Sequence, residues 1–278
     1  MTYQYNFQKL KRLISNVTPR FLLMPTLLFI DIYIKRVFRS QSNEADLING
    51  IVKLDNESKL PIEFIEFGFD STEFNCISLS LKGENGLIFD PKKENVNLAK
   101  KILRKNTKIY CKKMIPDDLK SLVNPDVYSI ISIDVDGIDY EFAEVAFKFN
   151  KPNVLIVEYN STFGDKNIKV PFDINFDRHK YHSYYHGASI VALLNLAHSN
   201  NYCLYAVSEN AVNAFFLPSS KTKSYKCVGN LAYALNLNAH GIRSKVSMLS
   251  ISEQFKKVEN LPFVNLDNSV CHCPALNE

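Results

Sequence analysis

Residues 127–139 read Val-Tyr-Ser-Ile-Ile-Ser-Ile-Asp-Val-Asp-Gly-Ile-Asp. The first seven positions are almost wholly apolar and rich in β-branched side chains, which is typical of a strand buried on both faces, as in a parallel sheet. The run stops abruptly at Asp134-Val135-Asp136-Gly137. The stretch therefore predicts a central parallel strand that ends on carboxylates.

Further strands and helices alternate on both sides of this stretch. Strands are expected at residues 63–67, 86–89, 107–111 and 152–157, and helices at residues 72–81, 93–104, 117–122, 140–149 and 188–199. A closing antiparallel pair is expected at residues 202–207 and 213–217. Because each crossover is long enough to hold a helix, the pattern favours an α/β fold with right-handed connections and a mostly parallel sheet.

The outer parts of the chain differ from this pattern. We expect a helical extension at residues 1–58, the α/β domain at 59–220, and a helix (231–237) and tail at 221–278 that pack on the domain. The apolar run 21–34 contains Pro25 and Asp31 and is shorter than the roughly 20 residues of a bilayer span. We interpret it as a buried helix, with peripheral membrane contact through residues 21–38 as the alternative.

Composition limits the classes of function. The 278 residues include 33 basic and 29 acidic side chains, and the net charge of +4 is too small and scattered to indicate nucleic-acid binding. The six cysteines lie far apart and do not resemble a disulfide framework. With no convincing secretory signal, these features predict a cytoplasmic protein.

Carboxylates follow four of the predicted parallel strands, namely in Glu66-Phe67-Gly68-Phe69-Asp70, at Asp90, in Asp134-Val135-Asp136 and at Glu158. Open α/β sheets bind ligands outside the carboxyl ends of their strands. Four such ends on one crevice predict a ligand site.

The first two strand ends predict a nucleoside-binding loop. Gly68 allows a sharp turn, and Asp90 follows it by 22 residues, a distance at which an acidic side chain can accept the hydroxyls of an adenosine ribose. The full glycine fingerprint of dinucleotide sites is missing, because Asp70 stands where a second glycine is expected. Glu66, Asp70 and Asp134 would repel a pyrophosphate, whereas S-adenosylmethionine carries a sulfonium and an ammonium group. These five residues form the predicted cofactor site.

The Asp134–Asp139 stretch has two interpretations. Asp134 and Asp136, with Glu158, could hold a divalent ion such as magnesium or act as general bases. Alternatively, Asp136 or Asp139 could cap the following helix. The sequence leaves both open.

Residues 178–187 combine histidine, tyrosine and arginine. Such a segment suits a sugar-like substrate, whose ring faces stack on aromatic side chains, or a lid that packs on the sheet. His182 and Tyr185 are predicted substrate contacts here, and His186 is a candidate base. Zinc binding is not favoured, because the spacing lacks the usual ligand pattern.

Several of these motifs occur together in one known family. They are S-I-D-x-D-G-x-D-Y at 132–140, E-Y-N at 158–160 and G-A-S at 187–189, with the strand ends at Gly68 and Asp90 and the run Asn213-Ala-Phe-Phe. Over about residues 60–220 the chain resembles the FkbM-like methyltransferases, in particular a bacterial branch found among sugar and surface-polysaccharide genes. The resemblance implies a Rossmann-like class I methyltransferase fold, S-adenosylmethionine as donor, and O-methylation of a hydroxyl on a sugar, glycan precursor or natural product.

Carried over by position, the resemblance implies that Glu66, Gly68 and Asp90 contact the cofactor and that Asp134 lies between cofactor and acceptor. Asp136, Glu158 and the histidine segment would face the acceptor, and we add Asn160 as a substrate contact. The candidate catalytic bases are Asp134, Asp136 and His186. Two other functions stay open: a nicotinamide-dependent oxidoreductase, and a non-catalytic glycan-binding protein whose cofactor loop has decayed.

Overall fold

The computed structural model describes residues 40, 42–56, 59–69, 74–122, 124, 126–221 and 249–266. Asp70, the run 21–38, the expected helix at 231–237 and most of both predicted extensions lie outside these residues. The chain divides into two compact units, which are described separately. Unit 1 comprises Met1–Met114 and Asn124–Asp134, and unit 2 comprises Ile115–Val123 and Val135–Glu278.

The described strands form a seven-stranded sheet in the order β3-β2-β1-β4-β5-β8-β7. Strands β1 to β4 pair in parallel, whereas β8 runs antiparallel to both β5 and β7. This confirms the predicted α/β fold with a mostly parallel sheet and a terminal antiparallel hairpin.

Unit 1 holds the first half of the sheet. Its elements are α3 (Glu44–Asp55), β1 (Ile62–Phe67), α4 (Ile77–Lys82), β2 (Asn85–Asp90), α5 (Lys93–Ile102), β3 (Thr107–Cys111) and β4 (Tyr128–Ile133). Phe67 is in register with Phe89 on one side and with Ile133 on the other. Gly68, Asp90 and Asp134 therefore follow their strands at the same edge of the sheet.

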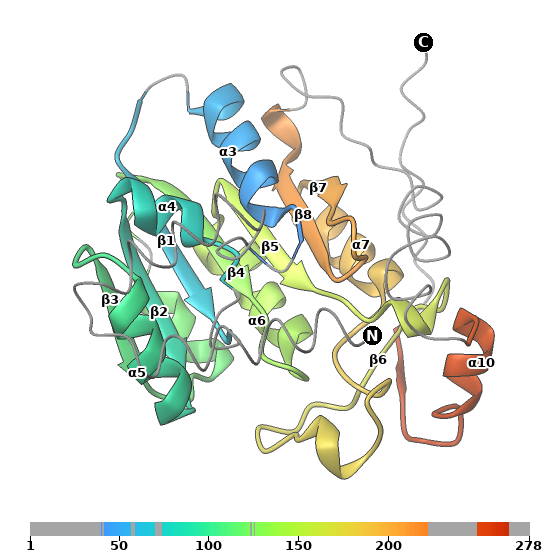
Figure 1. Cartoon of the computed structure of the whole chain (residues 1–278). Coiled ribbons are helices and arrows are strands. Elements are labelled where there is room, and N and C mark those ends of the chain that lie inside the picture. The colour runs from blue at the N-terminus through green and yellow to red at the C-terminus, as the bar shows by residue number, and fades with distance from the viewer. Residues whose placement is uncertain are drawn as a thin grey trace. The chain divides into compact units, whose positions relative to one another are not determined.

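The packing of α5 and the end of α4 can be explained by the residues that form them. Helix α5 packs against β2 and β3 (Figure 1) through an apolar face that includes the buried Val96, Ala99 and Ile102. Helix α4 ends at Gly83, whose left-handed φ of +90° suits a glycine that terminates a helix. The sequence predicted a start for this helix at residue 72, but the helix begins at Ile77, because Phe74–Cys76 form a turn whose N–H groups at Asn75 and Cys76 are bound by Glu66.

Unit 2 holds the second half of the sheet and the segments around it. Its elements are η1 (Pro116–Ser121), α6 (Asp139–Val145), η2 (Ala146–Asn150), β5 (Val154–Glu158), η3 (Ser161–Phe163), β6 (Ile168–Lys169), η4 (Arg178–Lys180), α7 (Ile190–Ser199), β7 (Tyr202–Val207), β8 (Asn213–Pro218), η5 (Ser219–Lys221), α10 (Ile251–Lys256) and β9 (Val264–Asn265). Ser189 is the N-cap of helix α7, and its hydroxyl accepts a hydrogen bond from the backbone N–H of Ala192.

The structure describes part of the predicted tail, residues 249–266. Strand β9 pairs with β6, and Val258 lies in a buried cluster with Phe163, Tyr185 and partly buried aromatic side chains. The sequence did not predict this because a two-residue strand leaves no periodicity to detect. A second difference concerns the cysteines, whose spacing did not indicate a disulfide: Cys76 and Cys111 are free thiols, whereas Cys203 is disulfide-bonded.

In the part of the chain that the structure describes, no helix is both long and apolar enough to cross a membrane.

Two glycines of unit 1 should respond oppositely to substitution by alanine. A Cβ at Gly86 would overlap the ring of Phe64, which is fully buried and faces Gly86 across the β1–β2 pair. We expect Gly86→Ala to lower the free energy of unfolding by about 1–3 kcal/mol. Gly50 lies inside α3 with open space around it, so Gly50→Ala should stabilise by about 0.5–1 kcal/mol. Denaturant titration measures both, and equal effects would contradict the packing described here.

Candidate functional site

The first loop of unit 1 turns at Gly68. Its φ of +70° lies in the left-handed region, which glycine adopts without steric cost. Its N–H donates a hydrogen bond to the carbonyl of Phe89 (2.9 Å). The chain therefore leaves β1 bent toward the end of β2.

Asp90 lies beside this turn, at the last position of β2. Its side chain is 4% exposed, and burial raises its pKa above the ordinary value. Oδ1 accepts a hydrogen bond from the backbone N–H of Lys92 (2.7 Å), and Oδ2 accepts a longer one from Phe69 (3.4 Å). The Asn95 amide donates to Asp90 Oδ1 (3.4 Å) and to the carbonyl of Phe69 (2.9 Å). The carboxylate is thus held directly against the first loop.

Glu66 fixes the other end of the same loop. It is buried, and its two oxygens accept hydrogen bonds from the backbone N–H groups of Asn75 (2.7 Å) and Cys76 (3.0 Å). Burial raises the pKa of Glu66 to about 7. Its observed role is to hold the segment that leads into α4, and its predicted contact with a cofactor stays a prediction.

Asp134 is placed by the same sheet. Its N–H donates to the carbonyl of Phe67 (2.9 Å), so it follows β4 beside the end of β1. Gly68, Asp90 and Asp134 are therefore brought together as predicted from the strand ends. Asp70, the fifth predicted cofactor residue, lies outside the described residues.

In unit 2, the turn before α6 is organised by Asp139. Its carboxylate is fully buried, and it accepts hydrogen bonds from the backbone N–H groups of Val135 (2.7 Å) and Gly137 (2.9 Å). The N-cap of α6 is Ile138, and no side chain caps the helix. The alternative is therefore confirmed in part: Asp139 accepts backbone N–H groups before the helix, but neither it nor Asp136 is the N-cap of α6.

Asp136 lies at the tip of this turn, with a left-handed φ of +60°. Its carboxylate forms an ion pair with the guanidinium of Arg178 in η4. The ring of Phe176 lies so close to Gly137 that a Cβ at this position would overlap it. Residues 176–181, which include η4 and are called the η4 segment below, therefore pack directly on the Val135–Gly137 turn.

Glu158 and His186 lie together in unit 2. Their side chains are almost fully buried, and His186 Nδ1 lies 3.7 Å from Glu158 Oε2. The next residue, Gly187, lies against Asp139, because a Cβ there would be 3.4 Å from Asp139 Oδ2. Burial and the charge of Glu158 raise the pKa of Asp139 to about 8. Asp139, Glu158 and His186 thus form one buried group of titratable side chains.

The other predicted substrate residues have structural partners. The Asn160 amide donates to the carbonyls of Tyr184 (2.8 Å) and His186 (2.9 Å), and its oxygen accepts from the N–H of Thr162 (3.0 Å). Tyr185 is buried, and its hydroxyl donates to the carbonyl of Pro262. Asn160 therefore holds the histidine segment in place, and Tyr185 packs in the cluster with Phe163 and Val258.

His182 is more exposed than His186. Its Nδ1 accepts a hydrogen bond from the N–H of Tyr184 (3.2 Å), and the two rings lie 4.9 Å apart. The structure thus separates the two predicted histidines, because only His186 joins the buried group.

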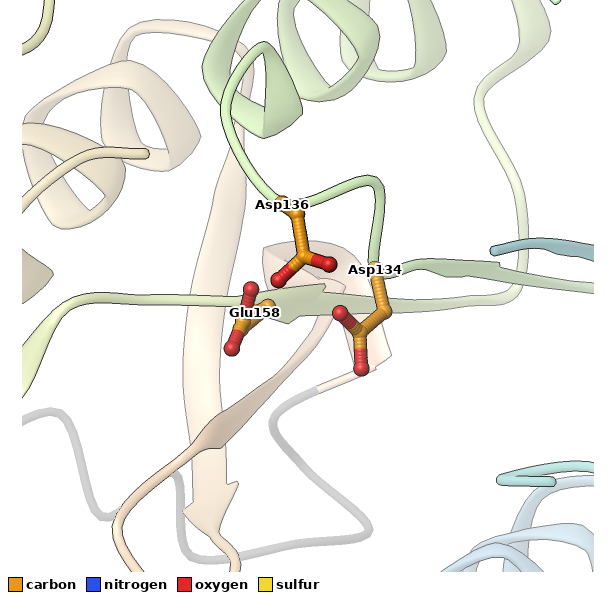
Figure 2. Close-up of side chains that lie close together, drawn as sticks. All are labelled: Asp134, Asp136 and Glu158. Carbon is orange, nitrogen blue, oxygen red and sulfur yellow. The ribbon is translucent and has the colours of Figure 1, made fainter. Parts of the chain in front are cut away.

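Three carboxylates could hold a metal ion. Asp134, Asp136 and Glu158 each offer an oxygen, and these oxygens lie within 4.8 Å of one another (Figure 2). A set of carboxylate oxygens suits a hard divalent cation such as magnesium. An ion here would compete with Arg178 for the Asp136 carboxylate.

Two residues of this region were not predicted as functional. Asp139 was considered only as a helix cap, although its place as the third acid in D-x-D-G-x-D was a signal. Arg178 begins the histidine–tyrosine segment, but pairing with a side chain 42 positions away leaves no trace in one sequence.

Comparisons with known proteins give remote similarities. No protein-family model and no curated protein matches the chain. One similar solved structure is the methyltransferase domain of bacterial CtHen1-C, with 15% identity, TM-score 0.38, and coverage of 63% of this chain and 98% of that one. A second is magnesium protoporphyrin IX methyltransferase from Synechocystis PCC 6803 with bound SAM, with 10% identity, TM-score 0.39, and coverage of 64% of this chain and 80% of that one. A third is the bifunctional kinase-methyltransferase WbdD, with 12% identity, TM-score 0.40, and coverage of 69% of this chain and 46% of that one. The identities and TM-scores are low, so these structures show a remote similarity alone.

The raised pKa of Asp139 predicts a pH-dependent stability. The unfolded chain loses this proton near the ordinary value of 3.8, whereas the folded chain holds it to about 8. Between these values the folded state binds more protons, so the free energy of unfolding should fall as the pH rises from about 4 to about 8. The raised pKa of Glu66, about 7, should likewise make the free energy of unfolding fall as the pH rises toward about 7.

Denaturant titrations across this pH range should give a flatter profile for Asp139→Asn than for the wild type, above all between about pH 7 and 8. The exposed Asp126, two residues before β4, serves as the control, and Asp126→Asn should leave the profile unchanged. An unchanged slope in Asp139→Asn would show that Asp139 ionises normally.

Proposed function

We propose that this chain is an S-adenosylmethionine-dependent O-methyltransferase that acts on a hydroxyl of a sugar, glycan precursor or natural product. The observation that carries the proposal is the position of Asp90. Its carboxylate ends β2 directly against the left-handed turn at Gly68, where the ends of β1 and β2 meet.

This geometry suits the ribose of an adenosine cofactor. A carboxylate at the end of the second strand can accept both ribose hydroxyls, while the glycine turn lets the ligand approach the backbone. Asp90 Oδ2 makes only a long hydrogen bond to Phe69 (3.4 Å), so it retains capacity to accept from a hydroxyl. The backbone N–H of Lys92 and the side-chain amide of Asn95 hold the carboxylate in place through hydrogen bonds to Oδ1.

The charge around the loop favours S-adenosylmethionine over a dinucleotide. Glu66 and Asp134 lie at the ends of β1 and β4, at the same edge of the sheet as Asp90 at the end of β2, and carboxylates repel the phosphates of a dinucleotide. The sulfonium and ammonium groups of S-adenosylmethionine are cationic and would be attracted. We assign the cofactor to Gly68, Asp90 and Asp134, with Glu66 shaping the loop and Asp70 as a further predicted contact.

The buried group of unit 2 is the proposed source of the catalytic base. S-Adenosylmethionine, when bound, supplies an activated methyl group, so the protein must orient the acceptor oxygen and remove its proton. His186 is the first candidate, because Glu158 lies 3.7 Å from Nδ1 and would stabilise the imidazolium formed when the ring accepts that proton. Asp134 and Asp136 remain candidate bases.

Asp134, Asp136 and Glu158 would hold a divalent ion if one takes part. Such an ion would lower the pKa of an acceptor hydroxyl.

The η4 segment supports a sugar-like acceptor. Tyr181 is 51% exposed, and its ring stacks on Phe176 at 5.6 Å between ring centroids. Phe176 in turn lies on Gly137, next to Asp136. An exposed aromatic face beside a carboxylate–guanidinium pair can stack on a sugar ring and bond its hydroxyls. His182 and Glu158 are further proposed contacts, and Asn160 and Tyr185 hold this segment in position.

The ribose assignment predicts a loss of cofactor affinity in Asp90→Asn. Asparagine keeps an oxygen for the N–H of Lys92, so the fold should persist, but the charged acceptor is lost. Hydrogen bonds to charged groups contribute about 1.5–3 kcal/mol, so the Kd for S-adenosylmethionine should rise about 10- to 100-fold. Isothermal titration calorimetry measures this, with the exposed Asp126→Asn as control. Unchanged affinity in Asp90→Asn would remove the basis of the assignment.

The base assignment predicts a separation of binding from turnover. In His186→Gln, kcat should fall about 10²- to 10⁴-fold while the Kd for S-adenosylmethionine stays constant, because the change lies outside the cofactor site. S-Adenosylhomocysteine release with a panel of monosaccharides and nucleotide sugars measures turnover. His198→Gln, at the end of α7, is the matched control. Full turnover in His186→Gln would shift the role to Asp134 or Asp136.

A further inference from the structure

A concentrated basic region lies on α5, on the turn that follows it and on β3. Residues 92–113 contain nine lysine and arginine side chains and a single acidic one, Glu94, which gives a local net charge of +8. The whole chain has a net charge of +4, so the remaining residues together carry −4. Residues 92–113 are therefore the most strongly basic stretch of this length in the chain.

These side chains face solvent. Eight of the nine cationic residues are exposed, and Lys101 is partly buried. Helix α5 turns Val96, Ala99 and Ile102 toward the sheet, which leaves positions such as Lys93 and Lys100 on its outer face. The turn closes tightly, because the N–H of Thr107 donates to the carbonyl of Arg104 (2.9 Å). Exposed cationic side chains therefore occur on α5, on the turn after it and on β3.

Strand β3 ends the sheet and extends this surface. It comes last in the strand order of the described sheet, so one of its sides carries no described neighbouring strand. Lys108 is exposed opposite Leu87, and Tyr110 is 43% exposed with its ring stacked on Phe89 at 5.1 Å. Helix α5 lies alongside this strand (Figure 1). We call the exposed side chains of residues 92–113 the basic edge.

Protection of the sheet edge explains only part of this charge. Lysines on an edge strand prevent pairing with other chains, and Lys108 serves that purpose. The lysines on the outer face of α5 protect no strand, because the helix satisfies its own backbone. A solvated helix face usually mixes both signs of charge, whereas this helix has one acidic side chain at its start, Glu94. The basic edge therefore suits an anionic partner.

We propose that the basic edge binds the surface of a membrane that contains anionic phospholipids. Eight of its nine cations are lysines, which act as hydrated point charges and are attracted to a diffuse negative surface without a fixed geometry. Readout of a nucleic acid would favour the forked guanidinium of arginine, and Arg104 is the single arginine of the segment. Tyr110 adds a half-exposed aromatic ring with a polar tip, a group favoured at membrane–water interfaces. The apolar face of α5 stays packed on the sheet, so binding is electrostatic and reversible.

Sedimentation of the full chain with lipid vesicles tests this proposal. The protein should bind vesicles of phosphatidylcholine mixed with phosphatidylglycerol and should not bind phosphatidylcholine alone. Binding should weaken steeply with salt, because the Debye length falls from about 10 Å at 0.1 M to about 3 Å at 1 M. Each lysine near an anionic surface strengthens binding about fivefold, so the triple change Lys100→Gln, Lys105→Gln and Lys108→Gln should weaken it at least about tenfold.

The matched control replaces three exposed lysines of unit 2, namely Lys148→Gln, Lys256→Gln and Lys257→Gln, and should bind nearly as the wild type. Circular dichroism checks that both variants fold. Three results would overturn the proposal: no binding to the anionic vesicles, equal loss in both triple variants, or binding to single-stranded RNA in place of the vesicles. The outcome is independent of the proposed methyl transfer, because no step of the assay uses the cofactor or an acceptor.

Discussion

Buried carboxylates require hydrogen-bond donors, and this requirement fixes the loops at the strand ends of this structure. Glu66, Asp90 and Asp139 are almost or fully buried, and burial raises the pKa of each. Each meets this cost by accepting hydrogen bonds from backbone N–H groups of a loop at a strand end. The loops that border the candidate site are therefore fixed by the same side chains that give it its charge.

The acids at the strand ends differ in the groups that their oxygens bind. Glu66 and Asp139 direct both oxygens to backbone N–H groups, so their first role is to shape the loop before α4 and the turn before α6. Asp90 is held more loosely, through one short and two long hydrogen bonds, and lies against the glycine turn. Asp136 and Glu158 meet side chains instead, Arg178 and His186. Asp90, Asp136 and Glu158 are therefore better placed to meet a ligand than Glu66 and Asp139.

The sequence was sufficient for the fold and for the sheet edge at which Gly68, Asp90 and Asp134 follow their strands. The buried run before Asp134 and the regular alternation of strands with helices predicted the parallel sheet, because periodicity and strand ends are local properties. The roles of Asn160 and Tyr185 could not be predicted, since their hydrogen bonds to His186 and Pro262 join positions 26 and 77 residues apart. The basic edge was missed for another reason: a net charge of +4 for the whole chain conceals a segment of +8.

The account depends on the position of Asp90 beneath the Gly68 turn, and a crystal structure of the chain with S-adenosylhomocysteine tests it most directly. The account predicts both ribose hydroxyls within hydrogen-bond distance of the Asp90 carboxylate, with the sulfur toward Asp134. A ligand bound elsewhere, or a ribose that contacts no carboxylate at the end of β2, would contradict it.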